Sequence, residues 1–326
     1  MDRSSSLTPR PSLTLRKVLA DFASSSLPDV PAWCVAVSGG ADSLALAAAA
    51  AAIRPTTALI VDHDLQSGSQ AVAETARRQA LELGCVDARV LRVTVSGPGG
   101  PEAAARGARY SALDDARAGA PVLLAHTLDD QAETVLLGLG RGSGARSIAG
   151  MRVSNPPWFR PLLGIRRADT RASCTELGID AWDDPHNHDR RFTRVRLRYE
   201  VLPLLDEALG GGVAEALART AAALCEDNDT LDALALRLLE AACDGDDTVC
   251  VESLGSSPAA LRRRAIRAWL LAGGAEGLTD KQIRGVDALV TAWRGQGGVA
   301  VGSALRRARL FAARRGGRLI LYSEPV

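Results

Sequence analysis

The chain has 326 residues, and its 39 basic and 38 acidic side chains leave a formal net charge of +1. This length allows two domains, and the balance of charge excludes binding of nucleic acid through overall charge, so local clusters would have to provide it. No apolar run is long enough to span a bilayer and no secretory signal is recognised, so we expect a cytoplasmic protein without a membrane partner. The six cysteines form no CxxC pair, which predicts reduced thiols instead of a zinc knuckle or a disulfide framework.

The first part of the chain predicts a tail, a helix and a strand. Residues 1–12 are rich in Ser and Pro, which predicts disorder, and residues 13–22 can form an amphipathic helix. The apolar run at 33–37 predicts a buried strand, which leads into a Ser-Gly-Gly turn. The Ala-rich stretch at 44–53 then predicts a helix, so a strand, a glycine turn and a helix follow one another directly.

The turn has the composition of a phosphate-binding loop. Gly39 and Gly40 lack side chains that would keep the backbone from a ligand, and the start of the next helix offers unpaired N–H groups. Ser38 and Ser43 add hydroxyl donors, whereas Asp42 suits an anion site only if a divalent cation lies between its carboxylate and the phosphates. A tight turn without a ligand remains the alternative. We predict that phosphate is held by Ser38, Gly39, Gly40, Ala41, Asp42 and Ser43, with Asp42 as the metal ligand.

Strands and helices continue to alternate beyond this loop. The pattern predicts strands at 57–61, 88–95 and 121–125, and helices at 69–83, 101–117 and 129–139. The alternation predicts an α/β fold in which a parallel twisted sheet carries helices on both faces. Ligands of such sheets lie beyond the carboxyl ends of the strands, so Asp62, His63 and residues 126–133 would gather beside the loop.

The pattern changes after residue 163. A helix is predicted at 166–177 and an Arg-rich helix from 193, and long helical patterns follow at 213–242, 258–271 and 279–293. The segment 299–322 carries six arginines and no acidic residue, so it forms a local basic patch. We predict a catalytic α/β domain at 1–208 and a smaller, mainly helical domain at 209–326.

A second group of reactive side chains lies at 125–134. At helical spacing Asp130 and Glu133 lie on one face, so two carboxylates would point into the same crevice. Two acids this close repel each other unless a metal or a cationic substrate lies between them. A helix cap or a surface ion pair is the alternative for either acid. His126 could transfer a proton because an ordinary histidine titrates near neutrality, although a packed histidine is also compatible with the pattern.

Two motifs resemble a known family. Residues 38–43 resemble the SGGxDS signature of PP-loop ATP pyrophosphatases. Residues 125–134, with Arg141-Gly142-Ser143-Gly144, resemble the HHxDDQxET and RGxG segments of tRNA(Ile)-lysidine synthetases, and shorter segments at 61–65, 102–110 and 160–163 also resemble that family. The resemblance covers residues 33–205. The chain departs from the family pattern at Ala125, Gln66 and Ala145-Arg146-Ser147.

The resemblance implies an ATP-dependent carbon-nitrogen ligase. Free L-lysine would be joined to C2 of the wobble cytidine in the CAU anticodon of tRNA(Ile), through an adenylated cytidine, with AMP and diphosphate as products. The modified tRNA would read AUA as isoleucine instead of AUG as methionine. The cofactors implied are ATP and Mg²⁺, and the helical domain with its basic segment would bind the tRNA.

The resemblance also implies roles for single residues. Asp42 would hold magnesium, Asp62 and His63 would contribute to the ATP site, and Arg106 would clamp the α-phosphate or the adenylated base. Asp130 and Glu133 would bind lysine and, with Asp42, Arg106 and His126, form the catalytic set. Arg194 and Arg198, in the Arg-rich helix, would contact the tRNA substrate.

Three other functions would each need features of their own. A tRNA thiolase of the same superfamily would need paired cysteines or a cluster, and an amidating synthetase would need a source of ammonia. A non-catalytic nucleotide sensor would need neither the acid pair nor the arginines. The sequence leaves room for a homodimer and does not identify the general base.

Overall fold

The computed structural model describes residues 12–63, 68–95, 100–142, 144–243, 247–303 and 308–325, without the side chains of 101 and 102. The predicted tail therefore lies outside the described residues except for Ser12, and so do Asp64, Gln66, Ser143, Arg306 and Arg307. The chain divides into two compact units, Met1–Gly142 with Ser147–Ala222, and Ser143–Arg146 with Ala223–Val326. The domain boundary expected at 208/209 stays a prediction.

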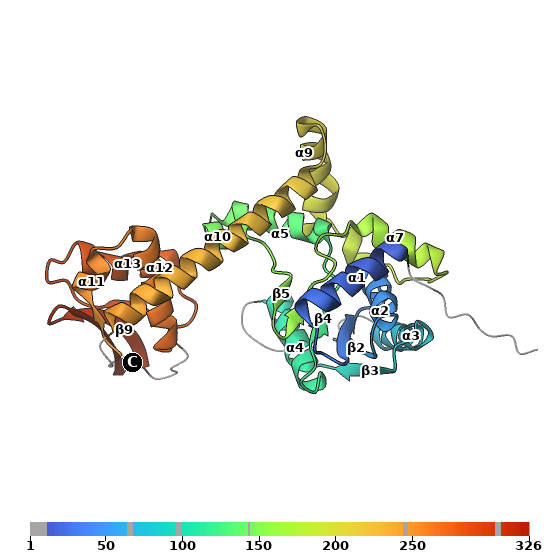
Figure 1. Cartoon of the computed structure of the whole chain (residues 1–326), viewed down its shortest axis with the longest axis horizontal. Helices are drawn as coiled ribbons and strands as arrows, with labels where there is room; N and C mark the ends of the chain where they lie inside the picture. Colours follow the sequence, from blue (N-terminus) through green and yellow to red (C-terminus); the bar gives the residue numbers. More distant parts are fainter. Residues whose placement is uncertain are drawn as a thin grey trace, which may run out of the picture. The chain divides into compact units, whose positions relative to one another are not determined.

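The first unit is built on a six-stranded sheet of order β3-β2-β1-β4-β6-β5 (Figure 1). Its strands are β1 (Trp33–Val37), β2 (Thr56–Asp62), β3 (Asp87–Arg92), β4 (Val122–Leu123), β5 (Ser154–Asn155) and β6 (Trp158–Phe159). Neighbouring strands pair in parallel, except that β5 is antiparallel to β6. This mostly parallel sheet confirms the predicted α/β fold.

Helices cover both faces of the sheet because successive side chains of β1 enter two different cores. Trp33, Val35 and Val37 pack with residues of α1 (Leu13–Ser26), α2 (Ala41–Ala51), α3 (Ser69–Glu82) and α7 (Arg167–Glu176). Cys34 lies in the other core with Leu113 of α4 (Pro101–Ala116). All residues from Ser43 to Ala50 of α2 are buried, since small Ala side chains let α2 lie close to the sheet, α1 and α7.

The carboxyl ends of β1, β2 and β4 meet at one edge of the sheet, because these neighbouring strands are parallel. The glycine turn follows β1, Asp62 ends β2, and Thr127 follows β4 as the N-cap of α5 (Leu128–Arg141). The short helix α6 (Ala145–Ile148) and the 3-10 turn η1 (Pro185–His188) lie further along the chain. A continuous helical stretch then packs on α5 and consists of α8 (Thr193–Arg196), the π-helical turn η2 (Leu197–Val201) and α9 (Leu202–Leu209).

The second unit contains part of α10 (Val213–Ala242), α11 (Val251–Gly255), α12 (Ala259–Ala272) and α13 (Asp280–Thr291). It also contains an antiparallel sheet of order β7-β10-β9-β8, formed by β7 (Val249–Cys250), β8 (Val299–Val301), β9 (Ala308–Arg315) and β10 (Arg318–Pro325). The sequence did not predict this sheet, because Leu310, Ala312 and Leu319 are buried between arginines that we interpreted as a basic patch. Within the described ranges, no helix has both the length and the hydropathy that a bilayer crossing requires.

Candidate active site

The loop between β1 and α2 is held by its own side chains. Ser43 Oγ donates to Gly40 O at 2.8 Å and accepts from Ser38 N at 3.1 Å, so the loop closes around a buried hydroxyl. Gly39 has a φ of +84°, and a Cβ on it would lie 3.4 Å from Ala76 Cβ. The first N–H groups of α2 have no intrahelical acceptor and begin where the glycines leave the backbone accessible.

Two neighbouring segments fix this loop from outside. The Trp182 N–H donates to Gly39 O at 3.0 Å, and Gln79 Nε2 of α3 donates to Asp180 O at 2.7 Å. From α7, Thr170 Oγ1 donates to Asp42 Oδ1, and Arg167 Nε donates to Asp42 Oδ2 at 3.4 Å. Burial raises the pKa of Asp42, although Thr170 and Arg167 act to lower it.

Asp130 belongs to the capping box of α5. Its Oδ2 accepts from Thr127 N at 2.8 Å and from Thr127 Oγ1 at 2.9 Å, and its Oδ1 accepts from Arg167 Nη2. Burial alone would raise the pKa of Asp130, but the Arg167 charge and the Thr127 hydrogen bonds outweigh it and lower that pKa. Asp130 is therefore held as a carboxylate.

Glu133 is completely buried, one turn along the same face of α5. Its Oε1 accepts from Arg198 Nε at 2.8 Å and lies 3.5 Å from Arg167 Nη1, and its Oε2 lies 3.7 Å from Arg194 Nη1. Oε2 accepts no hydrogen bond from any residue that the structure describes. Asp130 and Glu133 thus lie on one face of α5, and the cation between them is Arg167 of the chain itself.

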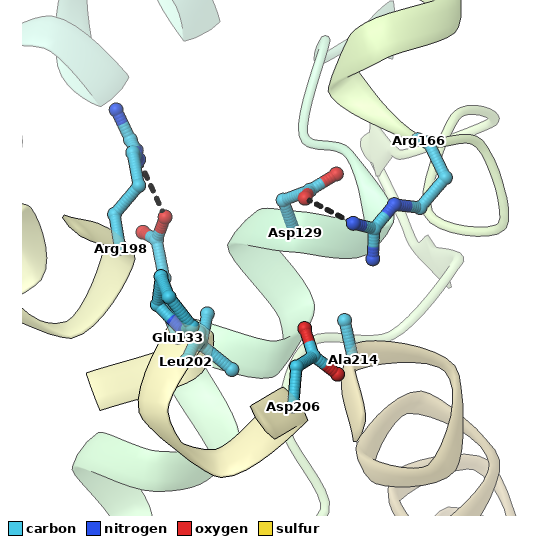
Figure 2. A pocket seen from close by; sticks show the side chains of 8 residues that line it. Asp129, Glu133, Arg166, Arg198, Leu202, Asp206 and Ala214 are labelled. Atoms are coloured by element: carbon cyan, nitrogen blue, oxygen red, sulfur yellow. Dashed lines mark hydrogen bonds and ion pairs between the residues drawn. The ribbon is translucent and has the colours of Figure 1, made fainter. Parts of the chain in front are cut away.

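A cavity of about 120 Å³ opens beside Glu133 (Figure 2). Its polar walls are Asp129, Arg166, Glu133, Arg198 and Asp206, and its apolar walls are Leu202, Pro203 and Ala214. Figure 2 shows Glu133 directed to Arg198 on one side, and Asp129 paired with Arg166, at 3.4 Å, on the other. The cavity therefore offers acids, guanidinium groups and an apolar wall, which suits a small zwitterion with an aliphatic stem.

His126 and Arg106 lie in a more cationic environment. Burial, together with Arg160, Arg109 and Arg106, lowers the pKa of His126 to about 4, although Asp130 acts in the opposite direction. His126 is therefore neutral at neutral pH, and the expectation that it titrates near neutrality is wrong for this structure. The Arg106 guanidinium lies 5.0 Å from the centre of the Tyr110 ring, which leaves its charge available to an anion.

Asp62 ends β2 and His63 follows it, at the same edge of the sheet as the loop. Asp62 is buried, and the His63 Nδ1 atom is buried without a hydrogen-bond partner among the described residues. Burial and the Arg109 charge lower the pKa of His63, while Asp62 acts to raise it. A neutral imidazole nitrogen at this place can bond to a ligand that enters the edge.

Sequence reasoning missed Arg167, Thr170 and Asp206. Arg167 was predicted only as part of a helix, although a cation in the first turn of a helix is disfavoured by the macrodipole and was a signal that could have been used. Asp206 accepts from Val213 N at 2.9 Å, a contact between the end of α9 and the start of α10 that has no sequence pattern. Arg194 and Arg198, expected to contact tRNA, lie against Glu133 in this structure.

Comparisons with known proteins show the family and the fold of the chain. The PP-loop domain model matches residues 12–205, and the TilS substrate binding domain model matches residues 250–319. A U34-tRNA thiolase, NcsA from Methanococcus maripaludis, with its [4Fe-4S] cluster, shares the fold with a TM-score of 0.54 at 15% identity, over 65% of this chain and 79% of that chain.

Curated relatives named tRNA(Ile)-lysidine synthase match over nearly the whole length. The protein of Mycobacterium tuberculosis (strain ATCC 25618 / H37Rv) is 65% identical over 329 residues, covering 100% of both chains. That of Mycobacterium leprae is 64% identical over 96% of this chain and 97% of the relative. That of Nocardia farcinica is 63% identical over 95% of this chain and 98% of the relative. The chain therefore belongs to the tRNA(Ile)-lysidine synthase family.

Proposed function

We propose that this chain ligates free L-lysine to C2 of the wobble cytidine in the CAU anticodon of tRNA(Ile), at the expense of ATP. The observation that carries the proposal is the junction of a phosphate loop with an acid pair. Asp42 of α2, next to the loop, and Asp130 and Glu133 of α5 all contact the guanidinium of Arg167. A nucleotide and a cationic substrate would therefore bind next to each other.

The first step is adenylation of the base. Ser38, Gly39, Gly40 and the amides of Ala41 and Asp42 would hold the ATP phosphates, with Asp62 and His63 at the neighbouring strand end. The C2 oxygen of cytidine attacks the α-phosphorus, and diphosphate leaves. Mg²⁺ is commonly bound by one or two carboxylates together with substrate phosphates, and Asp42 fits this role. It would supply positive charge to the leaving diphosphate.

The second step transfers lysine. Once its ε-ammonium has lost a proton, the amine forms the C2–N bond, and the C2–O bond breaks as AMP leaves. Asp130 and Glu133 would hold the ammonium, because an unpaired buried charge costs several kcal/mol. The apolar wall at Leu202 and Pro203 would pack against the aliphatic stem.

Arg106 and His126 would act on the adenylated base. Arg106 would hold the α-phosphate, and the neutral His126 would donate or accept a hydrogen bond instead of carrying a charge. Arg194 and Arg198 lie beside Glu133, so they would contact the substrate tRNA at the catalytic site. Contacts to RNA phosphates would instead come from exposed arginines such as Arg190 and Arg191, and from the arginines of the C-terminal segment.

Glu133→Gln tests the lysine site. The variant keeps the shape of the side chain but loses the charge, so the KM for lysine should rise about thirtyfold or more while the KM for ATP changes little. Glu176→Gln, at an exposed acid of α7, is the matched control. Equal effects of Glu133→Gln on both KM values would contradict the lysine role.

The thiolase reading lacks support in the chain. Cys34, Cys85 and Cys174 are buried, and burial raises the pKa of Cys85 to about 12 and that of Cys174 to about 11. In the described part of the chain, no group of three His, Cys, Asp or Glu side chains is placed to hold a metal ion. A sulfur-carrying cluster therefore has no ligand set there.

A further inference from the structure

Arg167 contacts acids from two different elements. Its Nε lies 3.4 Å from Asp42 Oδ2 on α2, its Nη1 lies 3.5 Å from Glu133 Oε1 on α5, and its Nη2 bonds to Asp130 Oδ1. Its side chain is only 13% exposed. The guanidinium therefore lies between the proposed metal ligand and the proposed lysine site.

The placement of Arg167 is built into the fold. Its backbone N–H donates to Asp129 Oδ2 at 2.8 Å, and its carbonyl oxygen lies 2.8 Å from Thr170 Oγ1. Arg167 begins α7, where the positive end of the helix dipole disfavours a cation. Contacts with the three acids offset this cost. An arginine at this position is therefore explained by these contacts and not by the stability of α7.

The charges of this cluster are already balanced. The carboxylates of Asp42, Asp130 and Glu133 face the guanidinium groups of Arg167, Arg194 and Arg198. A lysine ammonium would add a positive charge to this balanced set. One arginine must therefore withdraw from the acids before the ammonium can pair with them.

Of these three arginines, Arg167 is the one with an alternative partner near the phosphate loop. It already contacts Asp42, next to the loop that would hold the phosphates, and guanidinium groups form strong paired hydrogen bonds with phosphate oxygens. Arg194 and Arg198 contact α5 acids alone among the proposed site residues. Bound ATP would therefore draw Arg167 away from Asp130 and Glu133.

We propose that Arg167 is a positioning residue that occupies the place of the lysine ammonium and moves to the ATP phosphates when nucleotide binds. This rests on the proposed function. It makes ATP and lysine binding cooperative, because nucleotide removes the Arg167 charge from Asp130 and Glu133, and only the Arg194 and Arg198 charges stay beside these acids. By linkage, lysine then raises the affinity for nucleotide by the same factor.

The test is direct binding of labelled lysine by equilibrium dialysis, with and without a non-hydrolysable ATP analogue and magnesium. In the wild-type protein the analogue should lower the Kd for lysine about tenfold. Arg167→Met removes the competing charge, so its Kd without the analogue should fall about tenfold, and the analogue should then have little effect. Arg171→Met, an exposed arginine one turn along α7, should behave like the wild type.

The opposite result overturns the proposal. If Arg167→Met folds, by circular dichroism, yet binds lysine more weakly or equally, Arg167 is only structural. If Arg167→Met does not fold, the same binding measurement is made with Arg167→Lys, because a lysine ammonium cannot contact all three acids at once. The coupling should then drop at least about threefold, and unchanged coupling overturns the proposal. A wild-type protein that binds no lysine under either condition would instead contradict the proposed function.

Discussion

Asp42 combines a half-buried carboxylate with a place in the first turn of α2. Thr170 and Arg167 hold its two oxygens, so the side chain is oriented before any cation arrives. An amide in its place could still accept the Thr170 hydrogen bond but would bind magnesium poorly. An Asp42→Asn substitution therefore tests the charge of the carboxylate separately from its hydrogen bond to Thr170.

We predict that Asp42→Asn lowers tRNA-dependent ATP/diphosphate exchange about a hundredfold or more with the fold intact. The control is Asp169→Asn, at an exposed acid of α7, which should leave exchange near the wild-type rate. Exchange and circular dichroism spectra are measured together. Retained exchange in Asp42→Asn would remove Asp42 from the metal role.

His126 predicts a pH dependence of stability. Its pKa is about 4 in the folded chain, against an ordinary 6.5, so the unfolded state binds its proton more readily between these values. Stability from this group is therefore complete above about pH 6.5 and is lost as pH falls towards 4, by about 3 kcal/mol in total.

Urea unfolding at pH 7 and pH 4.5 measures this effect. His126→Gln removes the titrating group, so the loss in the free energy of unfolding over this interval should be smaller in the variant by about 2 kcal/mol or more. Equal losses in the variant and the wild type would show that His126 is not held neutral.

At the scale of elements, the glycine loop depends on backbone geometry. Gly39→Ala places a Cβ at a φ of +84° and 3.4 Å from Ala76, which should cost about 1–2 kcal/mol and weaken ATP binding. Gly119 has the same φ of +84° with open space around it, so Gly119→Ala should lose similar stability and keep ATP affinity. Calorimetric ATP titration separates the two effects, and equal affinities in both variants would contradict the loop assignment.

Most elements of the first unit were predictable because their signals are local. The helices at 69–83, 101–117 and 166–177 match α3, α4 and α7 to within about one residue, since apolar periodicity and turn residues mark them. The acids of α5 were predictable for the same reason. Arg167 was not, because its three partners come from distant parts of the sequence and only folding brings them together.

The sheet of the second unit had one local signal that was not used. Gly316 and Gly317 have φ values of +54° and +77°, which is typical of a two-residue hairpin turn. The strands beside them mix arginine with alanine and leucine, so they lack the regular alternation of apolar and polar residues that predicts a strand. Their pairing, Arg318 with Arg315, follows directly from this turn.

At the scale of the molecule, the predicted tRNA contacts are divided between the catalytic site and the C-terminal segment. A truncation after Ala222 keeps Val213 and Ala214, which pack with Leu128 and Leu202 of the first unit. It should keep ATP affinity and lose tRNA affinity, with a shallower dependence of the tRNA Kd on salt. Unchanged tRNA binding in a folded fragment would assign the second unit another role.

The proposed function requires one site that activates cytidine with ATP and delivers lysine to it. The most direct measurement incubates the full chain with ATP, magnesium, labelled lysine and a tRNA(Ile) transcript bearing CAU, beside the same transcript bearing UAU. Label should enter the CAU transcript alone, at the first anticodon position, with release of AMP and diphosphate. ATP cleavage without label in the RNA, or equal labelling of both transcripts, would contradict the proposed function.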